Sequence, residues 1–127
     1  MQEGSNWEAI QFAVRHKLSN LTVILDNNRL QAMDFLENIL TVEGRKDDLQ
    51  KKMKAFGFVV RTCNGHQIKS IISLIEGWIE IQKHLCAPQM LIAKTIKGYG
   101  LMCMENIPYF HFRLPTEEEL KMGKCYG

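Results

Sequence analysis

Residues 21–28 have the sequence LTVILDNN, a short run of apolar and β-branched side chains that ends abruptly in polar residues. Such a run is typical of a buried parallel strand, because a strand covered on both faces carries apolar side chains on both. The Asp-Asn-Asn that follows favours a turn and places the end of the strand near Leu25. This stretch therefore predicts one strand of a parallel sheet.

Helices and strands alternate along the rest of the chain. Apolar residues recur at helical spacing in some segments and form short continuous runs in others. Strands alternating with helices form right-handed βαβ units, so the predicted class is α/β, with a parallel sheet of about three strands between two helix layers. We predict helices at 6–17, 46–55, 67–83 and from Thr116, strands at 21–25, 58–62 and 90–93, and long loops at 29–44 and from Lys97.

Three local signals mark helix ends. Ser5 and Glu8 have the spacing of a capping box, and so do Thr116 and Glu119. In a capping box, the hydroxyl and the carboxylate each accept a hydrogen bond from an amide at the start of the helix. Gly57 follows the second predicted helix, and a glycine in this position commonly ends a helix.

Composition excludes several classes of protein. The 127 residues are 46% hydrophobic and 24% charged, which fits one soluble globular domain and excludes disorder. The formal net charge of +2 is too small to indicate a nucleic-acid partner. The apolar runs are too short to span a membrane, and no secretory signal is visible. The four cysteines lack metal-ligand spacing, which favours reduced thiols in the cytoplasm.

Two polar segments lie where a ligand site is expected. In an open parallel sheet, ligands bind beyond the carboxyl ends of the strands. Asn27-Asn28 follows the first strand, and the KGYG sequence of residues 97–100 follows the third. An asparagine oxygen is a suitable ligand for Mg²⁺, but an Asn-Asn pair is also an ordinary turn. The residues alone leave both interpretations open.

Four segments resemble the transketolase family. Residues 2–31 resemble its thiamin-diphosphate-binding segment, and residues 94–100 (KTIKGYG), 104–115 (MENIPYFHFRLP) and 116–120 (TEEEL) resemble its downstream signatures in the same order. The likeness is greatest to the N-terminal subunit of split transketolases and covers nearly the whole chain. It implies that residues 1–127 form a single partial domain with the thiamin-diphosphate-binding fold, namely the C-terminal half of that domain.

The resemblance also implies the cofactor site. In the family, the metal is held by a Gly-Asp-Gly element, by a strand-end asparagine and by a backbone carbonyl two residues after it. Carried over, Asn28 and the carbonyl of Leu30 bind Mg²⁺, or Ca²⁺ or Mn²⁺ in its place, and with it the diphosphate. The Gly-Asp-Gly would end just before Met1. Gly98 and Gly100 match a loop close to the cofactor, with a plain glycine turn as the alternative.

Two further residues match positions with catalytic roles. His111 matches a family histidine near the diphosphate and the reacting carbons, whereas the residues alone favour a histidine within an aromatic cluster. Glu3 matches a glutamate in an acidic network near the dimer interface. The sequence departs from the family pattern at Asp34, Leu36 and Ile107, of which the first two lie in the loop after the expected metal site.

The resemblance implies transfer of a two-carbon ketol unit between sugar phosphates by a cytoplasmic enzyme of the pentose phosphate pathway type, with thiamin diphosphate and Mg²⁺ as cofactors. The expected partner is a pyrimidine-binding C-terminal subunit, or other parts of the same enzyme, in a dimer of such units. Deoxyxylulose-phosphate synthases and oxo-acid dehydrogenases share the metal motif, but residues 104–120 favour the transketolase type. The alternative is a non-catalytic remnant or interaction module that does not bind the cofactor alone.

Overall fold

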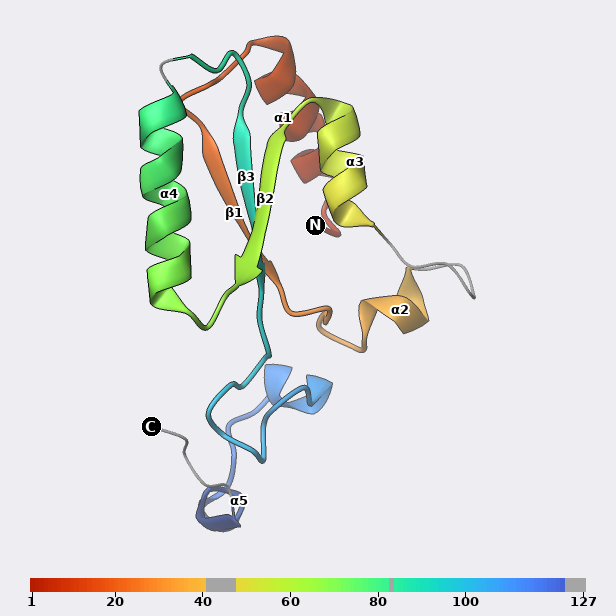
Figure 1. Cartoon of the computed structure of the whole chain (residues 1–127). Helices are drawn as coiled ribbons and strands as arrows, with labels where there is room; N and C mark the ends of the chain where they lie inside the picture. Colours follow the sequence, from red (N-terminus) through yellow and green to blue (C-terminus); the bar gives the residue numbers. More distant parts are fainter. Residues whose placement is uncertain (41–47, 83, 123–127) are drawn as a thin grey trace. The chain divides into compact units, whose positions relative to one another are not determined.

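A computed structural model describes residues 1–40, 48–82 and 84–122 (Figure 1). The chain divides into two compact units, which we describe separately: Met1–Asp26 with Asp48–Lys94, and Asn27–Asp47 with Thr95–Gly127. The elements, in chain order, are α1 (Gly4–Arg15), β1 (Thr22–Asn27), α2 (Leu36–Ile39), α3 (Leu49–Phe56), β2 (Val59–Asn64), α4 (Ile68–Gln82), β3 (Gln89–Lys94), the 3-10 turn η1 (Pro108–His111) and α5 (Glu117–Met122).

The first unit is built around a parallel sheet with the strand order β1-β3-β2. β2 and β3 pair in parallel over their full lengths. On the other side of β3, the amide of Gln89 donates to the Leu21 carbonyl at 3.0 Å, and the amide of Thr95 donates to the Asn27 carbonyl at 3.4 Å. The sequence offset is the same at both ends, so β1 also runs parallel to β3. The predicted α/β class with a parallel sheet is confirmed.

Helices cover both faces of this sheet, with α1 and α3 on one face and α4 on the other (Figure 1). Successive β3 side chains alternate between two cores. Met90 and Ile92 pack with residues of α1 and α3, whereas Leu91 and Ala93 pack with Trp78 of α4. These four side chains of β3 are all buried, so β3 is the strand that is covered on both faces.

β1, which we predicted to be buried on both faces, is covered on one. Val23 and Leu25 pack on the core beneath α1, but Ile24 on the opposite face is 58% exposed. β1 lies at the edge of the described sheet, where exposed apolar residues and unpaired backbone groups favour association. The prediction was wrong because an apolar run alone does not show which of its faces meets a second layer.

The helix ends were predicted with mixed success. The prediction of a capping box at Ser5 is wrong, because α1 begins at Gly4 with Glu3 as its N-cap residue. No side chain caps this helix. α3 is instead capped by Asp48, whose carboxylate accepts a hydrogen bond of 3.0 Å from an amide of the first turn. Gly57 ends α3 as predicted, with a φ of 108° in the left-handed region.

Some predicted boundaries lie outside the described residues, namely 41–44 of the first long loop, Lys46 and Lys83. In its described part, the first loop contains one short helix, α2. None of the helices in the described ranges is long and apolar enough to cross a membrane.

Candidate functional site

All the predicted site residues except Glu3 belong to the second unit. Glu3 lies in the first unit, where it is the exposed N-cap residue of α1 and its carbonyl accepts a hydrogen bond from the amide of Asn6. The residues of the second unit are Asn28, Leu30, Gly98, Gly100 and His111.

The second unit begins where β1 and β3 end. The hydrogen bond from the Thr95 amide to the Asn27 carbonyl shows that the chain leaves the two strands at neighbouring positions. The carboxyl ends of two adjacent parallel strands therefore meet here, which is the place where open α/β sheets bind ligands. Asn28 is the next residue after β1.

Asn28 forms a turn that fixes both predicted metal ligands. Its side-chain oxygen Oδ1 accepts a hydrogen bond from the Leu30 amide at 2.9 Å, which makes an Asx turn. Between them, Arg29 has a φ of 63°, which is uncommon for a residue with a Cβ atom. Leu30 is buried and forms an antiparallel bridge with Phe35. The side-chain amide group of Asn28 and the backbone of Leu30 are thus held in place by local hydrogen bonds.

Further polar contacts close the loop that follows. The guanidinium of Arg29 pairs with Glu37 of α2. The Asp34 carboxylate accepts hydrogen bonds from the Phe35 amide at 2.7 Å and from the Asn38 side chain at 2.9 Å. Both hydrogen bonds lower the pKa of Asp34, and the one from the Asn38 side chain has the larger effect. Asp34, one of the departures from the family pattern, therefore holds the loop that leads into α2.

This turn offers neutral oxygens rather than carboxylates to a cation. The Asn28 Oδ1 keeps a second lone pair beside its bond to Leu30, and no described residue donates to the Leu30 carbonyl. Across the described ranges, no group of three or more His, Cys, Asp and Glu residues could hold a metal. The turn therefore fits Mg²⁺ that takes its remaining oxygens from a diphosphate and water.

The two candidate glycines lie in a loop that is closed by its own hydrogen bonds. The amide of Asn106 donates to the Lys97 carbonyl at 2.9 Å and joins the ends of the loop. Gly98 and Gly100 have φ values of 75° and 92°, which glycine adopts without strain. The Gly100 amide donates to the Glu105 carboxylate at 3.1 Å. The turn therefore requires these glycines, and their closeness to a cofactor stays a prediction.

His111 is an exposed residue at the end of η1. Its ring lies 5.2 Å from the Phe112 ring in an edge-to-face arrangement. Tyr109 and Phe110 form a second ring pair in the same turn, with their centroids 6.4 Å apart. The aromatic neighbours expected from the sequence are present as two ring pairs, and His111 belongs to the pair with Phe112.

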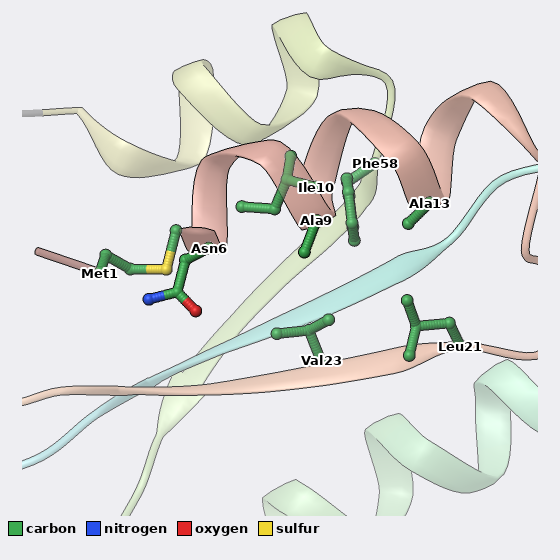
Figure 2. Close-up of a pocket in the computed structure, with 8 residues that line it drawn as sticks. All are labelled: Met1, Asn6, Ala9, Ile10, Ala13, Leu21, Val23 and Phe58. Atoms are coloured by element: carbon green, nitrogen blue, oxygen red, sulfur yellow. The ribbon is translucent and has the colours of Figure 1, made fainter. Parts of the chain in front are cut away.

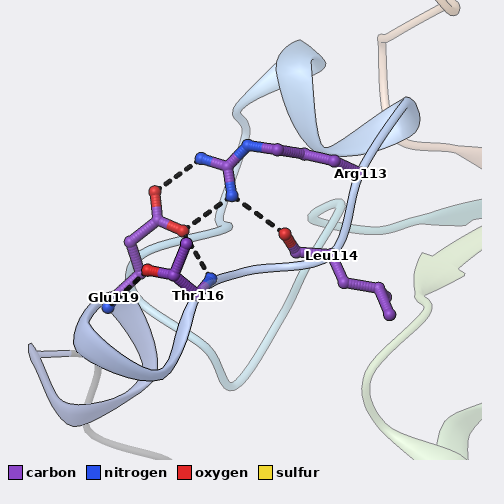
Figure 3. Close-up of polar contacts among 4 residues, drawn as sticks. All are labelled: Arg113, Leu114, Thr116 and Glu119. Atoms are coloured by element: carbon purple, nitrogen blue, oxygen red, sulfur yellow. Dashed lines mark hydrogen bonds and ion pairs between the residues drawn. The ribbon is translucent and has the colours of Figure 1, made fainter.

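Arg113, which is not among the predicted site residues, organises this segment (Figure 3). Its guanidinium carbon lies 4.9 Å from the ring centre of Tyr109 and 4.7 Å from that of Phe110. Its two terminal nitrogens donate to the two carboxylate oxygens of Glu119 at 2.7 and 2.6 Å. Nη1 also donates to the Leu114 carbonyl at 2.9 Å. The only signal in the sequence is an arginine between an aromatic run and an acidic one.

The capping box predicted at Thr116 and Glu119 is confirmed. The Glu119 carboxylate accepts a hydrogen bond from the Thr116 amide at 2.7 Å, and the Thr116 hydroxyl accepts one from the Glu119 amide at 3.2 Å (Figure 3). The hydrogen bonds from Arg113 and from the Thr116 amide lower the pKa of Glu119 to about 2, and the one from Arg113 has the larger effect. The same ion pair raises the pKa of Arg113.

Acid is expected to loosen α5. The pKa of Glu119 in the folded chain is about 2, below its ordinary value of 4.5, so its carboxylate stabilises the folded segment fully above pH 4.5. This stabilisation is lost as the pH falls from about 4.5 towards 2. Exchange of the Leu120 amide, which bonds to the Thr116 carbonyl, should accelerate over that window after correction for intrinsic rates.

Glu119→Gln is expected to exchange faster at neutral pH and to lose the acid transition. Glu118→Gln, which changes an exposed carboxylate of the same helical turn, should keep the wild-type profile. Identical profiles for the wild-type chain and Glu119→Gln would contradict this assignment.

An apolar pocket in the first unit lies between α1 and β1 (Figure 2). Its volume is about 120 Å³, below the roughly 300–1,000 Å³ of typical cofactor sites. None of the predicted site residues lines it, and its only polar side chain is Asn6, so it is a packing defect beside the edge strand. Its lining consists of Met1, Asn6, Ala9, Ile10, Ala13, Leu21, Val23 and Phe58.

The family model of the transketolase thiamine diphosphate binding domain matches residues 1–124. The chain belongs to the transketolase family. This confirms the family suggested by the four sequence segments, and it agrees with the parallel sheet and the strand-end turn.

Named relatives include a transketolase subunit and proteins named simply as transketolases. An apulose-4-phosphate transketolase subunit of Actinobacillus succinogenes is 39% identical over 95% of this chain and 41% of its own length. Human transketolase is 35% identical over 87% of this chain and 16% of its own length. A crystal structure of the Campylobacter jejuni transketolase matches with a TM-score of 0.70 and 28% identity, covering 85% of this chain and 16% of its own. This transketolase-family chain thus spans about two fifths of the Actinobacillus subunit and about a sixth of the human and Campylobacter transketolases.

Proposed function

We propose that this chain is part of an enzyme that transfers a two-carbon ketol unit between sugar phosphates with the help of thiamin diphosphate and Mg²⁺. The observation that carries this proposal is the Asn28 turn at the meeting point of two strand ends, in a chain of the transketolase family. When bound, thiamin diphosphate supplies the electron sink that stabilises the transferred carbon unit.

The residues of the second unit have distinct proposed roles. Asn28 Oδ1 and the Leu30 carbonyl hold Mg²⁺, or Ca²⁺ or Mn²⁺ in its place, and so orient the diphosphate. The local bonds of the turn keep both oxygens in position before the cation arrives, which lowers the cost of ordering them. The backbone at Gly98 and Gly100 borders the cofactor. The exposed ring of His111 lies near the reacting carbons and transfers a proton there.

We further propose that the chain acts together with a pyrimidine-binding C-terminal subunit, or with other parts of the same enzyme, and that such units form dimers. Support comes from relatives that are named as subunits of split transketolases, and from the exposed Ile24 on the edge strand β1. Glu3 would belong to the acidic network at the dimer interface. The unpaired cysteines among the described residues, Cys63, Cys86 and Cys103, fit a cytoplasmic enzyme.

Asn28→Ala is expected to weaken Mg²⁺-dependent binding of thiamin diphosphate by at least about tenfold, because it removes a metal ligand. Isothermal titration calorimetry with both cofactors measures this effect. The titration is done on the chain alone and on the chain with a transketolase C-terminal subunit, since the chain covers 41% of a split-enzyme relative.

Two control variants test whether the loss of binding belongs to the side-chain oxygen of residue 28. Asn28→Asp keeps an oxygen acceptor for the Leu30 amide and should retain binding, whereas Asn20→Ala removes an exposed asparagine outside the site and should bind as the wild type does. If the wild-type chain binds no cofactor in either titration, the proposed function fails, and the chain is instead a non-catalytic remnant or interaction module.

A further inference from the structure

We propose that Arg113 is a positioning residue for His111. Arg113 contacts the rings of Tyr109 and Phe110 and is bound by Glu119, and we call the Arg113–Glu119 pair the clamp. The clamp fixes the turn that ends in His111. The role of His111 towards substrate rests on the proposed function, but the clamp itself is a property of this chain. Neither Arg113 nor Glu119 is among the residues that the resemblance assigned to the site.

The turn that carries His111 cannot hold its shape alone. η1 has four residues, and an isolated 3-10 turn of this length has too few hydrogen bonds to offset the entropy lost on ordering it. The structure provides a second constraint, because the guanidinium of Arg113 contacts the rings of Tyr109 and Phe110, which directly precede His111. Two residues of the turn are thereby held by a side chain that follows it.

Glu119 anchors Arg113 in turn. Exposed ion pairs generally add little stability, because two flexible side chains must be ordered to form them. Here the side chains of Arg113 and Glu119 are only 32% and 27% exposed, and two parallel hydrogen bonds join them. The Glu119 carboxylate is already held by the Thr116 amide of the α5 capping box. The start of α5 therefore fixes Glu119, Glu119 fixes Arg113, and Arg113 restrains the turn that ends in His111.

The geometry requires arginine in particular. The guanidinium carbon lies 4.9 and 4.7 Å from two ring centres while its two terminal nitrogens bond to both oxygens of one carboxylate. A lysine at position 113 would keep the charge, but it would offer a single ammonium group and no flat surface. Arg113→Lys therefore tests the clamp without changing the net charge.

The test measures the mobility of His111 by NMR relaxation in the whole chain. In the wild type, the His111 amide should have an order parameter of about 0.85, as in a rigid backbone. In Arg113→Lys and in Glu119→Gln it should fall below about 0.6, and the His111 ring signal should shift with it. Arg15→Lys and Glu118→Gln, which change exposed groups outside the clamp, should leave His111 unchanged.

A His111 order parameter that stays at the wild-type value in both clamp variants would overturn the proposal. Exchange of the Leu120 amide provides a check on the helix, and Arg113→Lys is expected to mobilise His111 while α5 still forms. Addition of thiamin diphosphate and Mg²⁺ to the wild type, alone and with a transketolase C-terminal subunit, tests the proposed function separately. A missing response there would count against the function, whereas the order parameters alone decide whether Arg113 positions His111.

Discussion

Replacing Gly98 by alanine is expected to destabilise the loop between Lys97 and Asn106 by about 1–3 kcal/mol, through strain at a left-handed position. A Cβ atom on Gly98 would lie 2.7 Å from the Met104 carbonyl oxygen and 2.8 Å from its carbonyl carbon. Both contacts are with backbone, which cannot rotate away as a side-chain end can. The φ of 75° adds a second penalty for any residue that has a Cβ.

The loop has little room to relieve this strain. Its ends are joined by the bond between Asn106 and Lys97, and its middle is held by the bond between Gly100 and Glu105. Amide exchange at Gly100 and Asn106 should therefore rise roughly 5- to 150-fold in Gly98→Ala, since about 1.4 kcal/mol corresponds to a factor of ten. If the loop borders the cofactor as proposed, binding of thiamin diphosphate should weaken in the same variant.

Two other glycines provide matched controls. A Cβ on Gly4 would meet no atom within 4 Å, and one on Gly77 would make an ordinary contact of 3.5 Å with the Arg61 guanidinium. Gly77→Ala should even stabilise α4 by about 0.5–1 kcal/mol, because alanine favours the helix. Equal exchange rates at Gly100 in Gly98→Ala and in the wild type would show that the loop does not have this geometry.

Trp78→Ala is expected to cost about 3–5 kcal/mol of unfolding free energy, a large fraction of what a domain of this size has. Trp78 is 2% exposed and is the largest side chain in the core between α4 and the sheet. It packs there with Cys63, Leu91 and Ala93, and the Arg61 guanidinium lies 5.8 Å from its ring centre. Its loss leaves a cavity at the contact that holds α4 on the sheet.

Urea denaturation followed by circular dichroism measures this loss as a lower midpoint. Trp78→Phe separates packing from polar effects, because the buried indole N–H has no hydrogen-bond partner among the described residues. Phenylalanine keeps much of the apolar contact and removes this unpaired donor, so it should cost under about 1.5 kcal/mol. Ile79→Ala, which changes a 57% exposed neighbour, should stay within about 0.5 kcal/mol of the wild type. A wild-type midpoint in Trp78→Ala would contradict the packing of α4.

Much of the candidate site follows from short stretches of sequence. The Asn28 turn and the Thr116 capping box depend on contacts between residues two or three positions apart, and such contacts leave a recognisable local pattern. The Arg113 clamp joins residues six apart and two rings of an irregular turn, and no periodic pattern marks it. The capping box predicted at Ser5 failed because a pattern of this kind permits a cap but does not require one.

The sequence by itself determined the order of helices and strands, the α/β class and the resemblance to transketolases, because periodicity, turns and motifs are properties of neighbouring residues. Only the tertiary structure decided that β3, rather than β1, is the strand buried on both faces, and that Arg113 holds the turn of His111. The physical reason is that burial and side-chain contact depend on which layer or loop lies opposite. That layer or loop is supplied by residues far along the chain or beyond an irregular turn.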